Sequence, residues 1–225
     1  MKRLVAAAFA VALCLGSAVA QPMSSAQYAI KDDDGERVAN FDLGPGLADR
    51  LAKLPAQMPV GNLQGDVTLI QFYDLNCPYC REAARDVDAL VREDKKLKLV
   101  LVPYAVLSVQ SVQGALVEVG ASKSLTPEQY LDFHKKLYAG RGLIDGPRAL
   151  AVAGEFGLDK EKVAAVSNTE TTLDMLRANA DFGTAAKLGV TPAYVIGGVA
   201  ILGHPGLKPL QAVVAAMRAC GKVVC

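Results

Sequence analysis

The chain has 225 residues, of which 52% are hydrophobic and 21% charged, and its formal net charge is +1. This near-neutral balance argues against a nucleic acid or an anionic membrane surface as its main partner. The length is enough for one hydrophobic core, or for a core that carries an inserted subdomain.

Residues 1–20 have the three-part pattern of a secretory signal peptide. Lys2 and Arg3 precede an apolar stretch over 4–15, and small residues end in Ala18-Val19-Ala20. A transmembrane anchor would need about 20 apolar residues, more than this stretch supplies. We therefore expect export, with cleavage before Gln21. Cleavage would remove two of the 24 basic side chains and none of the 23 acidic ones, so the net charge falls from +1 to −1.

A strand–helix–strand unit is predicted over 66–107. Residues 66–74 are an almost continuous run of β-branched and aromatic side chains, typical of a buried strand. Apolar residues at helical spacing follow over 83–91, and 97–102 form a second strand that should lie parallel to the first. The preceding residues, 21–65, show little periodicity. For these we expect a loosely packed N-terminal leader with one short helix near 47–54.

The next segment, 108–187, has only helical patterns. Start signals such as Thr126-Pro127 and Asp145-Gly146-Pro147 predict four or five helices and no strand. Strands return at 193–196 and 199–202 around the hairpin signal Gly197-Gly198, and a last helix is expected over 207–219. This order predicts an α/β protein, with βαβ and ββα units over 66–107 and 188–225 and an inserted all-helical subdomain over 108–187.

Cys77-Pro78-Tyr79-Cys80 opens the first predicted helix. Because proline favours the first helical position, Cys77 should lie at the N-cap, where free N–H groups and the helix dipole stabilise a thiolate. Such sites have pKa values of about 3.5–7.5. We expect Cys77 to be an exposed, ionised nucleophile and Cys80 to face inward as the resolving thiol.

Two other functions of this pair are open. It could be a structural cross-link, or it could form a zinc site together with Cys220 and Cys225, although zinc ligands seldom follow a buried strand. His134 and His204 are far apart in sequence and suggest no metal cluster. We expect His134 on a helix surface and regard His204, in a Gly-His-Pro-Gly turn, as at most a candidate proton carrier. No metal or cofactor is expected.

The order of elements resembles the thioredoxin fold with a helical insertion. The strings TLIQFYDLNCPYC, EFGLDKEKV and AAKLGVTPAYVIGG resemble the DsbA-like thiol:disulfide oxidoreductases of bacterial envelopes, over about 65–219. The resemblance implies a periplasmic location. It also implies a cis peptide bond between Thr191 and Pro192 beside the cysteines, where the Thr191 backbone could pair with an unfolded substrate. Pro78 and Tyr79 would border the site, with Tyr79 tuning the potential and contacting substrate.

One position departs from the family pattern. Members commonly carry a buried acid where this chain has Gln71, and a carboxylate there would move protons to and from the resolving thiol. A glutamine cannot do so. Either Asp74, which is closer to the cysteines, takes over this role, or protons exchange through water.

Cys220 and Cys225 remain after the catalytic pair. Their separation allows local pairing around Gly221, and the oxidising compartment favours a structural disulfide behind the last helix. A second redox pair that relays electrons to Cys77 and Cys80 is the alternative.

Three functions are consistent with these patterns. The preferred one is an exported oxidase that donates the Cys77–Cys80 disulfide to unfolded or thiol-containing proteins, acts as a monomer and is reoxidised by a membrane partner. The second is a reductase or isomerase that is kept reduced; such isomerases assemble through an N-terminal segment. The third is a chaperone or binding module whose cysteines are only structural.

Overall fold

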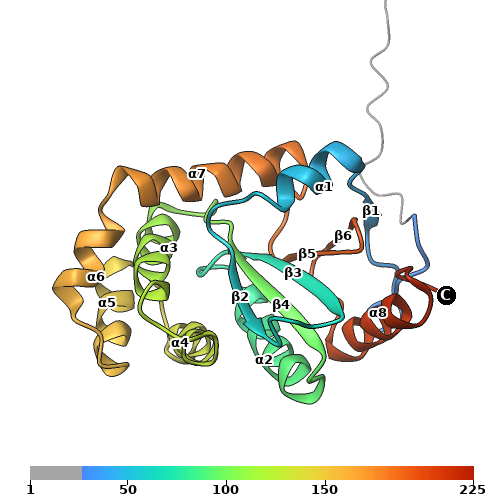
Figure 1. Ribbon diagram of the computed structural model, residues 1–225, viewed down its shortest axis with the longest axis horizontal. Coiled ribbons are helices and arrows are strands. Elements are labelled where there is room, and N and C mark those ends of the chain that lie inside the picture. The colour runs from blue at the N-terminus through green and yellow to red at the C-terminus, as the bar shows by residue number, and fades with distance from the viewer. Residues whose placement is uncertain (1–26) are drawn as a thin grey trace, which may run out of the picture.

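A single mixed sheet forms the centre of the protein in the computed structural model, which describes residues 27–225 (Figure 1). The strand order is β1-β6-β5-β3-β4-β2. The strands are β1 (Asn40–Asp42), β2 (Met58–Gly61), β3 (Val67–Tyr73), β4 (Leu97–Pro103), β5 (Ala193–Ile196) and β6 (Val199–Leu202). The predicted signal peptide and its cleavage site lie outside the described residues.

Eight helices surround the sheet in this part of the chain. They are α1 (Pro45–Leu51), α2 (Pro78–Glu93), α3 (Val109–Ser122), α4 (Pro127–Ala139), α5 (Gly146–Glu155), α6 (Lys160–Ser167), α7 (Glu170–Ala185) and α8 (Leu207–Cys220). The predicted α/β class, a thioredoxin-like βαβ–ββα order with helices between its halves, is therefore confirmed. No helix in residues 27–225 combines the length and apolar character needed to cross a bilayer.

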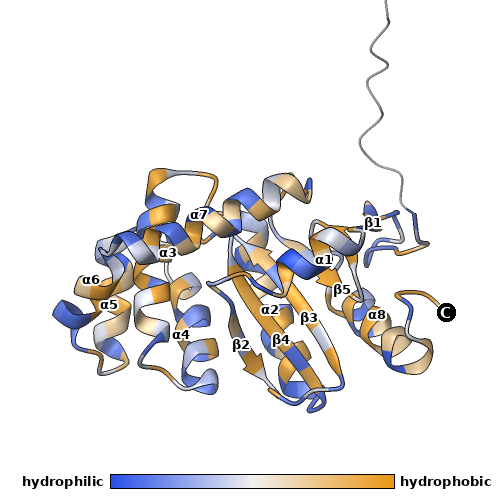
Figure 2. Ribbon diagram, turned by 45° about the horizontal axis from the view of Figure 1, so that its top comes forward, coloured by the Kyte–Doolittle hydropathy of each residue, from blue (hydrophilic) through white to orange (hydrophobic). Residues whose placement is uncertain are grey.

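The central strand β3 pairs parallel with β4 and antiparallel with β5. Because successive side chains point to opposite faces, odd-numbered residues of β3 such as Leu69 pack on the side of α2 and α8. Even-numbered residues such as Phe72 pack on the other side, where Leu51 of α1 and Phe182 of α7 complete a second core. Both faces are covered, which explains why β3 and β4 are almost entirely hydrophobic (Figure 2).

Helices α3 to α7 follow β4, in agreement with the predicted helical segment. Figure 1 shows α3, α4, α5 and α6 gathered beside the sheet, while α7 runs back from them toward α1. Local sequence begins these helices: Ser108, Asp145, Asp159 and Thr169 each cap a helix, and Thr126 forms a capping box with Gln129.

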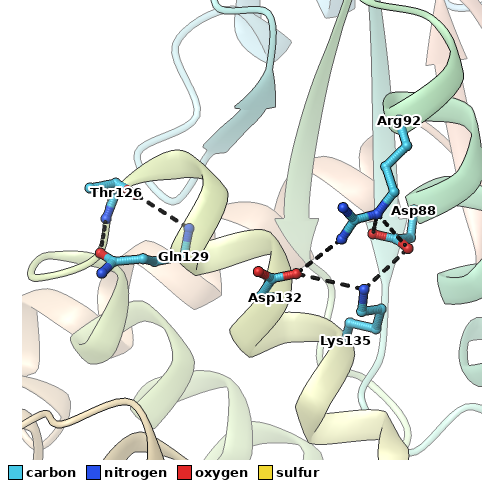
Figure 3. A network of polar contacts seen from close by, with 6 residues as sticks. All are labelled: Asp88, Arg92, Thr126, Gln129, Asp132 and Lys135. Carbon is cyan, nitrogen blue, oxygen red and sulfur yellow. Dashed lines mark hydrogen bonds and ion pairs between the residues drawn. The ribbon is translucent and has the colours of Figure 1, made fainter.

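Helix α4 lies against α2 through a network of charged side chains. Asp88 and Arg92 of α2 meet Asp132 and Lys135 of α4, next to the Thr126–Gln129 capping box (Figure 3). Ion pairs at the surface each contribute little to stability, so we expect this network to add little to the packing of the two helices.

The expectation of a loosely packed leader was wrong for 27–65. Strand β1 pairs with β6 at one edge of the sheet, and β2 pairs with β4 at the other. The expected short helix is α1, whose Leu51 is buried. Strands of three or four residues are too short to show a clear alternating pattern, and β2 contains Pro59 and Gly61, which normally argue against a strand. Edge positions tolerate both residues.

Candidate active site

Cys77 occupies the N-cap of α2, and Pro78 is the first helical residue, as the sequence predicted. Its Sγ lies 3.0 Å from the carbonyl oxygen of Thr191. Cys77 is only 4% exposed, so the expectation of an exposed sulfur was wrong. The cause is tertiary: the loop that carries Thr191 packs against the sulfur, 114 residues away in sequence.

The two cysteines are free thiols with opposite tendencies to ionise. The Cys80 thiol, which can donate a hydrogen bond to the Cys77 sulfur, lowers the Cys77 pKa from 9.0 to about 6. Contacts from Thr191 and from the backbone N–H groups of Tyr79 and Cys80 act in the same direction, against the opposing effect of burial. Cys80 is 1% exposed, and burial and the charge of Cys77 raise its pKa far above the ordinary value. The pair therefore consists of a nucleophilic thiolate and a protonated neighbour.

Thr191 and Pro192 lie beside this pair. The peptide bond between them is cis, as the resemblance implies, and Gly203 donates a hydrogen bond to the Pro192 carbonyl at 2.9 Å. Tyr79 extends from the first turn of α2 into solvent. The four residues that the sequence placed around the cysteines thus lie at one end of α2.

Asp74 is buried between the cysteine loop and the start of α3. One carboxylate oxygen accepts hydrogen bonds from the backbone N–H groups of Val106 and Leu107, and the other accepts from Asn76 N–H and the Ser111 hydroxyl. Four donors therefore hold this carboxylate in place, and it ties the loop after β4 to the active-site loop.

Gln71 lies on β3, fully buried, opposite Tyr194 in the β3–β5 register. Its Nε2 is 3.5 Å from the Tyr194 hydroxyl. Its Oε1 has no hydrogen-bond partner in residues 27–225.

The family profile described as thioredoxin matches residues 53–216, most of the chain and all of the site above. The chain belongs to the thioredoxin family.

Solved structures share the fold of this thioredoxin-family protein. A thioredoxin-like oxidoreductase from Silicibacter pomeroyi is 29% identical, with a TM-score of 0.68 over 76% of this chain and 98% of that one. The thiol-disulfide exchange protein alpha-DsbA2 from Wolbachia pipientis is 22% identical, with a TM-score of 0.69 over 76% and 92%. The catalytic domain of Proteus mirabilis ScsC is 20% identical, with a TM-score of 0.68 over 77% and 96%. No curated protein matches the chain. Family membership and the cysteine geometry together support the predicted class, a thiol:disulfide oxidoreductase.

The loops around the cysteines of this thioredoxin-family protein expose large hydrophobic side chains. Asp74 binds the backbone of 106–107, Asn76 binds the backbone of Ile144, and Cys77 contacts Thr191, so three loops are attached to the segment 74–77. The exposed residues on or next to these contacts form what we term the apolar rim: Tyr79, Val106, Leu107, Val109, Leu143 and Val190. The sequence alone did not identify these residues, because each lies in a loop or at a helix start, where hydrophobic residues follow no periodic pattern.

Two arginines hold one of these loops. Arg81, next to Cys80, donates to the backbone carbonyls of Tyr138, Gly140 and Gly142. Arg148 donates to carbonyls of the same loop, at 141–143. The loop that carries Leu143 is therefore fixed to the active-site helix.

His134 is buried, and the expectation that it lies on a helix surface was wrong. Its Nδ1 lies 2.7 Å from Oε1 of Glu118, a buried acid on α3, and the Tyr73 hydroxyl donates to Oε2 of the same carboxylate at 2.8 Å. This cluster joins α3 and α4 to the strand that leads to the cysteines. The sequence suggested an exposed position because His134 is followed by the charged residues Lys135 and Lys136.

Cys220 and Cys225 form a disulfide across the turn that ends α8. Gly221 lies at the helix C-cap with φ 72°, a left-handed conformation that glycine adopts readily. In residues 27–225 we find no group of three or more histidine, cysteine, aspartate or glutamate side chains that could hold a metal ion.

Proposed function

We propose that this protein is an exported, periplasmic disulfide donor that transfers the Cys77–Cys80 disulfide to thiol-containing proteins and works as a monomer. The observation that carries the proposal is the asymmetry of the pair, in which Cys77 has a pKa of about 6 and Cys80 stays protonated. Ionisation of Cys77 stabilises the reduced form, so the disulfide form is the stronger oxidant.

The exchange proceeds in two balanced steps. A substrate thiolate attacks Cys77 Sγ of the disulfide, a mixed disulfide forms, and Cys80 leaves with the bonding electron pair and takes up a proton. A second substrate thiolate then attacks the substrate sulfur of the mixed disulfide. Cys77 leaves as its stabilised thiolate, the substrate has lost two electrons, and the enzyme has gained them.

Other residues support this chemistry from fixed positions. Pro78 begins the helix that stabilises the thiolate, and the Thr191 backbone lies next to Cys77, where an extended substrate could pair with it. The apolar rim offers contacts for the hydrophobic segments of unfolded chains. A membrane redox partner would return the reduced pair to the disulfide form.

The N-terminal segment favours the monomer. Isomerases of this kind assemble through such a segment. In this chain the strands of the segment, 40–42 and 58–61, instead pair with β6 and β4 of the same molecule. Cys220 and Cys225 are proposed as a structural pair that closes the end of α8.

The reduction potential tests the proposed direction of electron flow. On a Cys220→Ser, Cys225→Ser background equilibrated with glutathione, we expect a value at pH 7 above the roughly −270 mV of thioredoxin. Lowering the Cys77 pKa from 9.0 to about 6 accounts for about 30 mV of this rise in reduction potential at pH 7. Below pH 6 the reduced form binds two protons and the slope should be about −59 mV per pH unit; above it, one proton is bound and the slope should be about −30 mV.

A potential at or below that of thioredoxin, with one slope through pH 6, would contradict the disulfide donor. It would favour the reductase or isomerase that a membrane partner keeps reduced.

Introducing a charge into the apolar rim should slow the oxidation of protein substrates but not that of small thiols. We expect Leu143→Asp to slow the oxidation of a reduced, unfolded protein about tenfold, because about 1.4 kcal/mol of apolar contact is lost. Oxidation of dithiothreitol should change little. Val166→Asp on α6, which also changes an exposed hydrophobic residue but lies outside the rim, is the matched control. Equal loss with both reductants would mean that the rim does not bind substrate.

A further inference from the structure

A chain of hydrogen-bonding side chains leads from the buried side of the sheet to the surface. The Tyr194 hydroxyl on β5 lies 2.8 Å from Nδ1 of His204, and Nε2 of His204 lies 2.9 Å from Oδ2 of Asp86 on α2. These residues come from three different elements, and none of the distances exceeds that of an ordinary hydrogen bond.

The inner end of this chain lies on the cysteine side of the sheet. Odd-numbered residues of β3, together with Tyr194 and Ile196 of β5, point into the same core as Cys80. Tyr194 is fully buried there, opposite Gln71. Burial chiefly, and then the negative charge that Cys80 can carry, raise the pKa of the Tyr194 hydroxyl, so this hydroxyl stays protonated between transfers.

The outer end reaches solvent. The side chain of Tyr194 is inaccessible, that of His204 is 13% exposed and that of Asp86 is 36% exposed. Accessibility therefore increases step by step along the chain, as a path between a buried thiol and bulk water requires.

We propose that Tyr194 and His204 carry protons between Cys80 and bulk water, and that Asp86 stabilises the His204 imidazolium that forms on the way. The inference rests on the proposed function, because Cys80 must lose or gain a proton whenever the disulfide closes or opens. Gln71 positions the tyrosine hydroxyl through its Nε2 but does not itself exchange a proton.

The protons balance in each direction. Because the Asp86 carboxylate only accepts, it selects the tautomer in which His204 Nε2–H donates and Nδ1 accepts from Tyr194. When the disulfide closes, the Cys80 proton passes to the Tyr194 oxygen while the Tyr194 proton passes to His204 Nδ1. The imidazolium, stabilised by Asp86, then releases its Nε2 proton to water. Opening the disulfide reverses each transfer.

Asp74 is the less suitable relay. Both of its oxygens already accept two hydrogen bonds, from Asn76, Ser111 and the backbone of 106–107. Protonating this carboxylate would break bonds that hold the loops of the site. The Tyr194–His204 pair can pass a proton with only a change of tautomer.

The closing step can be isolated by stopped flow. Reduced protein is mixed with rising concentrations of glutathione disulfide, and the second-order rate reports attack by Cys77. The first-order plateau reports closure by Cys80, which needs the proton transfer. In Tyr194→Phe we expect the plateau to fall by about tenfold to a hundredfold, with the second-order rate unchanged. Tyr28→Phe, which removes a hydroxyl bound to Asp42 near the N-terminal edge strand, is the matched control and should change neither rate.

Imidazole rescue distinguishes a proton carrier from a packing residue. His204→Gly should lower the plateau similarly, and added imidazole should restore it in a concentration-dependent way; the double variant with Tyr194→Phe should not respond. An unchanged plateau rate in His204→Gly, or a loss that imidazole does not restore, would overturn the proposal. This test does not depend on whether Tyr194→Phe folds. Failure of the wild-type protein to react with glutathione disulfide at all would instead contradict the proposed function.

Discussion

Cys77→Ser is expected to abolish disulfide transfer, lowering the rate by on the order of a thousandfold or more, because the substituted hydroxyl is neither ionised near neutral pH nor able to form the mixed disulfide. Serine is a favoured N-cap residue, so helix α2 should begin normally and the fold should be retained. The measurement is the rate at which the oxidised protein introduces a disulfide into a reduced, unfolded protein.

Two variants control for this loss. Cys80→Ser cannot form the Cys77–Cys80 disulfide, but its Cys77 thiolate should attack a disulfide of a substrate protein and accumulate an unresolved mixed disulfide, visible on a non-reducing gel. Cys220→Ser with Cys225→Ser should keep the activity if that pair is structural. Full activity in Cys77→Ser would instead identify the protein as a binding or chaperone module whose cysteines take no part in catalysis.

His134→Leu should have the largest effect on stability among single changes away from the cysteines. Leucine leaves Oε1 of Glu118 without its 2.7 Å partner in a position with no access to water. We expect the free energy of unfolding to fall by about 3 kcal/mol, because removing one partner of a buried polar pair exposes the other to the full desolvation penalty. Urea denaturation followed by circular dichroism measures this change.

Asp132→Ala on the same helix is the matched control. Its side chain is 53% exposed and bonds only to the surface groups shown in Figure 3, so a much smaller change is expected. Equal midpoints for His134→Leu and the wild type would show that the Glu118 cluster does not contribute to stability.

The central elements could be predicted from the sequence because their signals are local. The apolar run of β3, the helical spacing of α2 and Gly197-Gly198 each act within a few residues. The placement of the cysteine pair follows in the same way: Pro78 at the first helical position puts Cys77 at the N-cap. The Cys80 thiol, and to a smaller extent the N–H groups of the helix terminus, then lower the Cys77 pKa.

The remaining features depend on contacts between distant segments. Strands β1 and β2 form only because β6 and β4 offer open edges, and His134 is buried because Glu118 of α3 and Tyr73 of β3 pack against it. Thr191 reaches Cys77 across 114 residues, and Asp86 reaches His204 across 118. The sequence by itself therefore determined the βαβ and ββα order and the chemistry of the cysteine pair. The tertiary structure alone decided what covers the pair and which polar groups form hydrogen bonds with one another around it, because burial and hydrogen-bond partners arise only when separate elements pack together.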